Sequence, residues 1–117
     1  MTNEKPGPLK TLIVDDEAPA RTRLRQLLAD IDRDYHNLAI SCCGEAADGL
    51  QALTEVDRLQ PDLLLLDIRM PAMDGLEVAR HLQQLDKPPA VIFTTAYDEF
   101  ALEAFDANAV HYLVKPI

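Results

Sequence analysis

The chain has 117 residues, of which 48% are hydrophobic, and its formal net charge at pH 7 is −9. This length suits one domain with a core of its own, and the abundance of Leu, Ile and Val argues against disorder. The acidic charge argues against contact of this segment with a nucleic-acid backbone, which needs Lys and Arg. No apolar run approaches the length of a membrane span, so we expect no membrane partner.

The first eight residues are polar and include Pro6, Gly7 and Pro8. Because they lack the apolar core of a secretory signal, we expect a disordered tail over residues 1–8 and a single domain over residues 9–117. A first strand is predicted at Leu9–Val14. Its last three residues are all apolar, as in strands that are covered on both faces of a parallel sheet.

Helix and strand signals then alternate. The first helix begins near Pro19 and carries apolar residues at helical spacing: Leu24, Leu27, Leu28 and Ile31. A second strand is predicted at residues 38–43, and a second helix runs from Asp48-Gly49 to a stop at Pro61.

The second half of the chain continues this alternation. Strands are predicted at residues 62–66, 90–94 and 110–114. Asp74 and Glu77 fit a capping box at the start of the third helix, and Asp98 can cap a short fourth helix before the last strand. The whole pattern implies a parallel sheet with helices on both faces.

Carboxylates follow two of these strands. Asp15, Asp16 and Glu17 come directly after the first strand, and Asp67 comes directly after the third. Open α/β folds place their sites at this edge of the sheet. The acids meet there only if strands one and three are neighbours, and right-handed crossovers then favour a doubly wound, flavodoxin-like sheet in the order 2-1-3-4-5. Acids so close would repel one another, and Mg²⁺ is the simplest way to hold them together.

Two further polar groups lie at the same edge, because Thr95 follows the fourth strand and Lys115 follows the fifth. Together with the acids they suit phosphoryl chemistry. A carboxylate can attack phosphorus, a metal ion neutralises charge, and the ammonium and hydroxyl groups bind the remaining oxygens.

The ordered motifs are Asp15-Asp16-Glu17, Asp67-Ile68-Arg69-Met70-Pro71 with Asp74-Gly75, Thr95-Ala96 and Lys115-Pro116. As a set they resemble the receiver domain of bacterial response regulators, from about residue 9 to residue 117. Residues 95–105 and 112–117 further resemble receivers of the LytTR type, the group that includes the alginate regulators. Ala72 departs from this pattern, because the family often has Gly or Asn there.

The resemblance assigns roles in phosphorylation. Asp67 would be the phosphoacceptor, and Lys115 would pair with the phosphoryl group, or with Asp67 when that group is absent. Thr95 would swing its hydroxyl to a phosphoryl oxygen, and Tyr112 would be the aromatic switch that moves inward with it.

The resemblance also implies a Mg²⁺ site. Asp16 would ligate the ion directly and Asp15 mainly through water, while Asp67 and the backbone carbonyl of Arg69 would complete the set. Glu17 is expected to be a solvated acid at the helix start. The Lys115–Pro116 peptide would be cis and would aim the lysine at the site.

For the whole protein, the resemblance implies a cytoplasmic switch that is phosphorylated by a sensor histidine kinase and catalyses only its own phosphorylation and dephosphorylation. A LytTR-type DNA-binding domain would follow the receiver and control transcription, and the phosphorylated protein would be a homodimer. Because receivers normally close with a helix after strand five, we expect the segment to be truncated before its last helix.

Three alternatives remain at this point. A haloacid-dehalogenase-type phosphatase needs a second Asp two residues after its nucleophile, where this chain has Arg69, and its nucleophile precedes its acidic pair. A flavodoxin-like nucleotide binder needs a phosphate loop after strand one, where Asp15-Asp16-Glu17 would repel phosphate. The third alternative is a receiver-like interaction module that is never phosphorylated.

The remaining reactive side chains are expected to have no role in the site. Cys42 and Cys43 lack metal-type spacing and are expected to be reduced strand residues. His36, His81 and His111 lie among polar neighbours and are expected at the surface.

Overall fold

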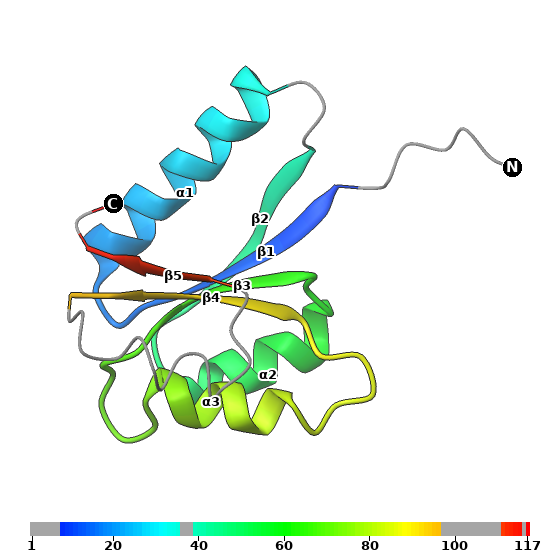
Figure 1. Ribbon diagram of the computed structural model, residues 1–117, viewed down its shortest axis with the longest axis vertical. Coiled ribbons are helices and arrows are strands. Elements are labelled where there is room, and N and C mark those ends of the chain that lie inside the picture. Colours follow the sequence, from blue (N-terminus) through cyan, green and yellow to red (C-terminus); the bar gives the residue numbers. More distant parts are fainter. Residues whose placement is uncertain (1–7, 36–38, 97–110, 116) are drawn as a thin grey trace, which may run out of the picture.

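A computed structural model describes residues 8–35, 39–96, 111–115 and 117 (Figure 1). It contains a five-stranded parallel sheet in the order β2-β1-β3-β4-β5. The strands are β1 (Leu9–Val14), β2 (Ile40–Ala46), β3 (Leu63–Asp67), β4 (Ala90–Thr95) and β5 (His111–Val114). This order confirms the doubly wound fold that the sequence predicts.

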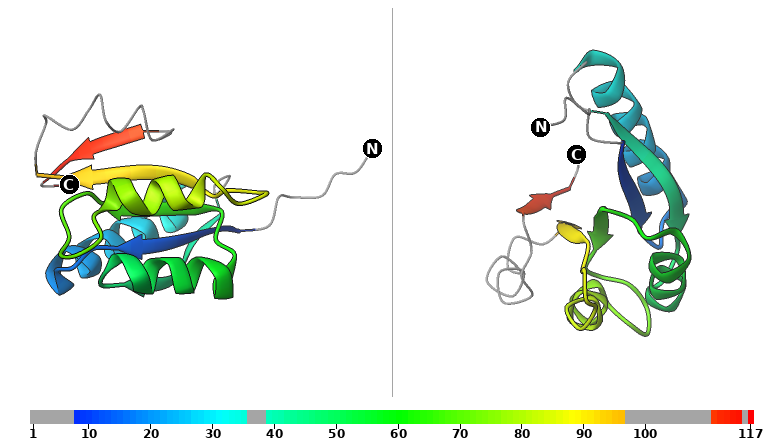
Figure 2. Two further views of the ribbon diagram at one scale, coloured as in Figure 1. Left: turned by 90° about the horizontal axis from the view of Figure 1, so that it is seen from below. Right: turned by 90° about the vertical axis from the view of Figure 1, so that its right-hand side faces the viewer.

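Three helices are described, and they cover the two faces of the sheet (Figures 1 and 2). Helix α1 (Ala18–Asp34) lies on one face, while α2 (Gly49–Leu59) and α3 (Gly75–Leu82) lie side by side on the other. The predicted tail, the helix capped by Asp98 and the Lys115–Pro116 peptide fall partly or wholly outside the described residues. Within the described part of the chain, no helix combines the length and apolar character that crossing a membrane requires.

Strand β2 lies later in the chain than the predicted range of 38–43. It includes Gly44 and Glu45, which are poor strand formers, because its pairing with the buried β1 overrides local propensity. Between Thr11 and Leu12 the register shifts, so that Thr11 pairs with Cys42 and Leu12 pairs with Gly44. This shift places one extra residue in β2, so that Val14 at the end of β1 pairs with Ala46.

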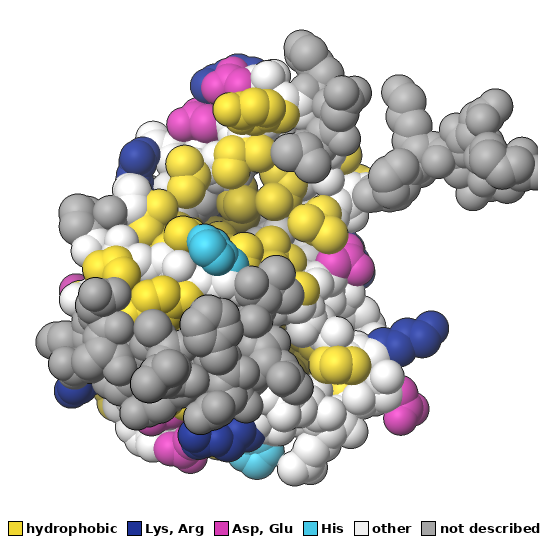
Figure 3. Space-filling view, viewed as in Figure 1, with side chains coloured by type: hydrophobic (Ala, Val, Ile, Leu, Met, Phe, Trp, Pro, Cys, Tyr) yellow, Lys and Arg dark blue, Asp and Glu magenta, His cyan; other side chains and the backbone are white. Residues whose placement is uncertain are grey.

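The two faces of the sheet carry separate hydrophobic clusters. Toward α2 and α3 lie Leu12, Val14, Leu64, Leu66 and Phe93, and toward α1 lie Ile13, Leu24, Leu28, Leu63 and Leu65. Successive strand residues alternate between faces, so β3 is buried on both sides, which explains its unbroken run of leucines. Figure 3 shows further hydrophobic side chains gathered beside α1; among the partly buried residues on that cluster are Ile40, Ala90, Ile92 and Ile117.

The prediction for His36 lies outside the described residues, while the other two histidines and both cysteines lie as predicted. His81 and His111 are exposed, and Cys42 and Cys43 are half-buried in β2 as free thiols.

Candidate functional site

Three carboxylates meet at the carboxyl edge of the sheet. Asp15 and Asp16 follow β1, Asp67 ends β3, and the two strands are hydrogen-bonded neighbours. One oxygen from each side chain lies within 4.8 Å of the others. Asp15 and Asp67 are buried, whereas Asp16 is exposed. The convergence that the strand pattern predicts is therefore present.

Asp15 is held on every side. One carboxylate oxygen, Oδ1, accepts the backbone N–H of Glu17 at 2.9 Å, and Oδ2 accepts the Lys115 ammonium at 2.7 Å. Its own N–H donates to the carbonyl of Ala46 in β2 at 3.1 Å. Because both carboxylate oxygens already have partners, this side chain is fixed in direction. Glu17 is exposed and is the N-cap residue of α1.

Lys115 links the first and third strands to the fifth. Its Nζ lies 2.7 Å from Oδ2 of Asp15 and 3.5 Å from Oδ1 of Asp67, so its shorter contact is with Asp15. Its backbone N–H donates to the carbonyl of Thr95 at 2.6 Å. Burial alone would lower the pKa of Lys115, but its bond to Asp15 and the charge of Asp67 outweigh burial and raise that pKa above its ordinary value. The lysine therefore remains a cation.

The environment of Asp67 disfavours its charged form. Burial raises its pKa to about 7, the charges of Asp15 and Asp16 act in the same direction, and Lys115 opposes them. Three acids thus face one ammonium group. A compact set of carboxylate oxygens with an excess of negative charge suits a hard divalent cation.

The other residues that the sequence assigns to the site lie around this cluster. Thr95 is fully buried at the carboxyl end of β4. Tyr112 pairs with Phe93 in the β4–β5 register, is half-buried and packs against the larger hydrophobic cluster. Arg69 is exposed in the loop between β3 and α3.

The start of α3 is pressed against the end of β3. Asp74 caps the helix by accepting the N–H of Glu77 at 2.9 Å, and the N–H of Gly75 donates to the carbonyl of Ile68 at 2.8 Å. A Cβ atom at position 75 would lie only 2.1 Å from the backbone oxygen of Asp67. Glycine is therefore needed for the close approach that sets the position of Asp67, a role that its place in the apolar stripe of the helix does not reveal.

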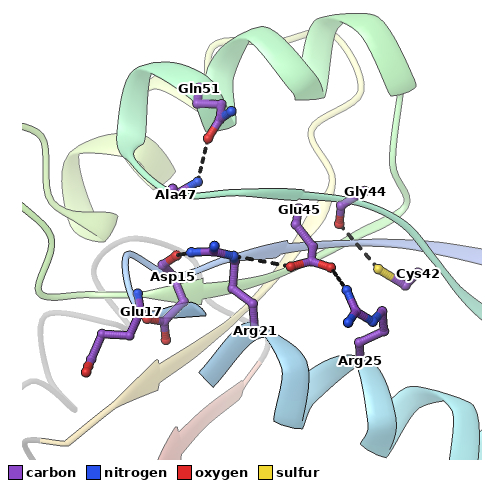
Figure 4. A network of polar contacts seen from close by, with 9 residues as sticks. All are labelled: Asp15, Glu17, Arg21, Arg25, Cys42, Gly44, Glu45, Ala47 and Gln51. Atoms are coloured by element: carbon purple, nitrogen blue, oxygen red, sulfur yellow. Dashed lines mark hydrogen bonds and ion pairs between the residues drawn. The ribbon is translucent and has the colours of Figure 1, made fainter. Parts of the chain in front are cut away.

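A second group of residues missed by the sequence analysis adjoins the acids (Figure 4). Arg21 of α1 donates from Nη1 to the backbone oxygen of Asp15 at 2.8 Å and from Nε to Oε1 of Glu45 at 3.2 Å. Arg25, one turn further along α1, bonds the other oxygen of Glu45. Since Glu45 belongs to β2, only the folded chain brings these residues together.

Comparison with known proteins places the chain in a family. The profile of the response regulator receiver domain matches residues 11–117. The chain therefore belongs to the response-regulator receiver family, the signalling switches of two-component systems. This membership favours the receiver interpretation over the phosphatase and nucleotide-binding alternatives.

Two relatives show where in this family the chain lies. It is 55% identical over 109 residues to the positive alginate biosynthesis regulatory protein of Pseudomonas aeruginosa, covering 93% of this chain and 42% of that protein. It is 40% identical to the sensory transduction protein LytT of Bacillus cereus, covering 92% of this chain and 42% of LytT. The chain thus spans less than half the length of these relatives.

Solved receivers share the fold. The receiver domain of the response regulator NarL of Mycobacterium tuberculosis superposes with a TM-score of 0.84 at 29% identity, covering 96% of this chain and 87% of that one. The response regulator TrrA of Thermotoga maritima, solved in complex with Mg²⁺ and beryllium fluoride, superposes with a TM-score of 0.74 at 33% identity, covering 92% and 87%.

Proposed function

We propose that residues 9–117 form a receiver domain in which Asp67 accepts a phosphoryl group from a sensor histidine kinase. The observation that carries this proposal is the meeting of Asp15, Asp16 and Asp67 within 4.8 Å, with the ammonium group of Lys115 in contact with Asp15 and Asp67. Asp67 lies at the end of a central strand, buried yet beside the exposed Asp16. A carboxylate in this setting is placed to act as a nucleophile.

Mg²⁺ fits this donor set, since hard divalent cations prefer carboxylate oxygens. Asp16 is the exposed acid and would bind the ion directly, whereas both oxygens of Asp15 are engaged by Glu17 and Lys115, which favours contact through water. Asp67 and the backbone carbonyl of Arg69 complete the proposed ligands. When bound, the ion offsets the negative charge of the acids and of the incoming phosphoryl oxygens.

The chain's own residues carry the transfer. A carboxylate oxygen of Asp67 forms a bond to phosphorus as the phosphorus–nitrogen bond to the kinase histidine breaks, and that nitrogen keeps the electron pair and takes up a proton. Lys115 pairs with a phosphoryl oxygen and Thr95 donates its hydroxyl to another. Because the nucleophile is the ionised form, the pKa of about 7 means that deprotonation of Asp67 and binding of a cation favour each other.

Acetyl phosphate with and without Mg²⁺, read by intact mass, tests this proposal. The wild-type chain should gain one phosphoryl group only with Mg²⁺, and Asp67→Asn should gain none, because an amide is not the nucleophile. Asp57→Asn, an exposed carboxylate on α2, serves as the control and should be labelled like wild type. Undiminished labelling of Asp67→Asn would show that another residue is the acceptor.

Two further measurements separate the alternatives. Asp16→Ala should lose more Mg²⁺ affinity than Asp15→Ala if Asp16 is the direct ligand. A wild-type chain that binds Mg²⁺ and is never labelled would be an unphosphorylated interaction module. Turnover of phosphate esters would contradict our proposal that the catalysis is limited to the chain's own phosphorylation and dephosphorylation.

The effect of phosphorylation on dimerisation and DNA binding is proposed from the relatives. In the natural protein, phosphorylation would shift Thr95 and Tyr112 and so promote a homodimer that binds DNA through a LytTR-type domain in the cytoplasm. To move the equilibrium between the inactive and active conformations from 1:99 to 99:1, phosphorylation must favour the active conformation by about 5.5 kcal/mol. Sedimentation of a chain that includes the following domain, with and without a phosphoryl mimic, tests it. Identical monomer–dimer behaviour in both states would remove dimerisation as the output.

A further inference from the structure

One network beside the site has no part in the phosphoryl transfer described above. It consists of Arg21 and Arg25 on α1, Glu45 on β2 and the backbone carbonyl of Asp15 (Figure 4). The side chains of Arg21 and Glu45 are only 20% and 26% exposed, so this is a partly buried cluster rather than a loose surface pair. It connects the helix and the edge strand to the loop that carries the acids.

The carbonyl that Arg21 binds belongs to the peptide that joins Asp15 to Asp16. A peptide unit is planar, so holding its oxygen restricts the orientation of the whole unit and with it the direction in which the chain continues to Asp16. The hydrogen bonds to Ala46, Glu17 and Lys115 hold Asp15 itself. The bond from Arg21 holds the carbonyl group through which the chain continues to Asp16, the exposed acid of the cluster.

The geometry of this contact requires an arginine. The guanidinium group is a rigid planar fork, and it uses Nε for Glu45 at 3.2 Å and Nη1 for the Asp15 carbonyl at 2.8 Å. Glu45 is in turn braced from the other side, because its second oxygen bonds Arg25. A lysine would keep the charge of Arg21 but lacks this planar fork, and so loses the fixed pair of contacts.

We propose that Arg21, aimed by Glu45, is a positioning residue for the cation site. It orients the Asp15–Asp16 peptide so that the Asp16 carboxylate points at the cation without reorganisation. Groups that orient metal ligands without touching the metal typically contribute about 10- to 100-fold in metal affinity. This inference rests on the proposed binding of Mg²⁺ by the three acids.

The sign of one mutational effect separates positioning from plain electrostatics. Arg21 is a cation beside a cation site, so if only its charge mattered, its removal would tighten Mg²⁺ binding. If Arg21 positions Asp16, removal weakens binding despite the loss of a repulsive charge. We therefore expect Arg21→Met to lower the Mg²⁺ affinity of the 117-residue chain about 10-fold in a calorimetric titration.

Arg33→Met is the matched control. Arg33 lies on the same helix about 18 Å further along and pairs only with Asp30 and Asp34 among the residues that the structure describes. This variant loses the same charge and should keep its Mg²⁺ affinity within about twofold of wild type. The amide resonance of Asp16 in metal-free protein gives a second readout, which Arg21→Met should shift and Arg33→Met should leave in place.

Arg21→Lys keeps the experiment decisive if the Met variant does not fold. It retains the charge and loses the fork, so it should bind Mg²⁺ more weakly than wild type. If wild type binds Mg²⁺ and the folded Arg21 variants bind it equally well or more tightly, the inference about Arg21 is wrong while the proposed function stands. A wild-type chain that does not bind Mg²⁺ would instead remove the proposed function, and the inference with it.

Discussion

At the scale of single residues, the burial of Asp67 disfavours the ionised carboxylate that the proposed function needs. The end of β3 buries its carboxylate beside Asp15, so the charged form is disfavoured in the metal-free fold. The unfolded chain has no such penalty. A carboxyl group whose pKa is raised on folding stabilises the fold fully below its unfolded pKa, and that contribution is lost as pH rises through the folded pKa. For Asp67 this window runs from 3.8 to about 7.

Asp67→Asn should therefore stabilise the metal-free protein at high pH. An amide cannot ionise, so the variant should exceed wild type in free energy of unfolding at pH 8, by up to about 4 kcal/mol, and by less at pH 5. Urea unfolding at both pH values in the presence of a chelator measures the two differences. The same gap at pH 5 and pH 8 would show that Asp67 does not titrate with a raised pKa.

Ala72 has an unfavourable backbone conformation. It lies in the loop between β3 and α3 with φ of 66°, a left-handed conformation that is unfavourable for residues with a Cβ atom. This explains why Gly or Asn would suit the position. Ala72→Gly should raise the free energy of unfolding by about 1 kcal/mol. As a control, Ala29→Gly at an exposed interior position of α1 should lower it by about 1 kcal/mol, and thermal unfolding of both variants compares the signs.

At the scale of elements, β3 and α3 are packed closely against each other at their junction. The N–H of Gly75 bonds Ile68, and no space remains between position 75 and the backbone of Asp67. The strand that carries the proposed acceptor and the helix that follows it are thus held as one unit. A change at Gly75 is transmitted directly to the end of the strand.

Gly75→Ala should test this coupling. The added Cβ atom meets a backbone oxygen, which cannot move cheaply, so we expect a loss of about 1–3 kcal/mol in stability together with weaker Mg²⁺ binding. Gly44→Ala is a suitable comparison, because a Cβ atom there would meet only the side-chain ends of Leu59 at 2.8 Å and Leu12 at 3.5 Å. Urea unfolding and Mg²⁺ titration of both should separate the variants; equal effects would contradict the argument.

The elements also show what a single sequence can and cannot predict. Asp15, Asp16 and Asp67 could be placed together because apolar runs mark the strands and the parallel sheet brings strand ends to one edge. The true bounds of β2 could not be predicted, since Gly44 and Glu45 join the strand only through pairing with β1. The contact of Arg21 with Glu45 was missed for the same reason: it depends on the packing of α1 against β2, which no local pattern records.

At the scale of the whole molecule, the charge of −9 opposes compaction. Like charges on the surface repel one another, and added salt screens this repulsion beyond about 8 Å at physiological ionic strength. The melting temperature without divalent ions should therefore rise between low and physiological KCl, by about 4 °C for each 1 kcal/mol gained. Tetramethylammonium chloride should act alike, because screening is not specific to the cation. A melting temperature that falls with either salt would contradict this account.

The distribution of the site along the chain has a consequence for its synthesis. The Asp15–Lys115 bond joins positions 100 residues apart. At about 5–20 residues per second, a ribosome completes Lys115 roughly 5–20 s after Asp15. A nascent chain therefore passes through a period in which the acids are made but the ammonium group that balances them is not. We expect released chains that end before residue 111 to resist proteolysis less than the 117-residue chain.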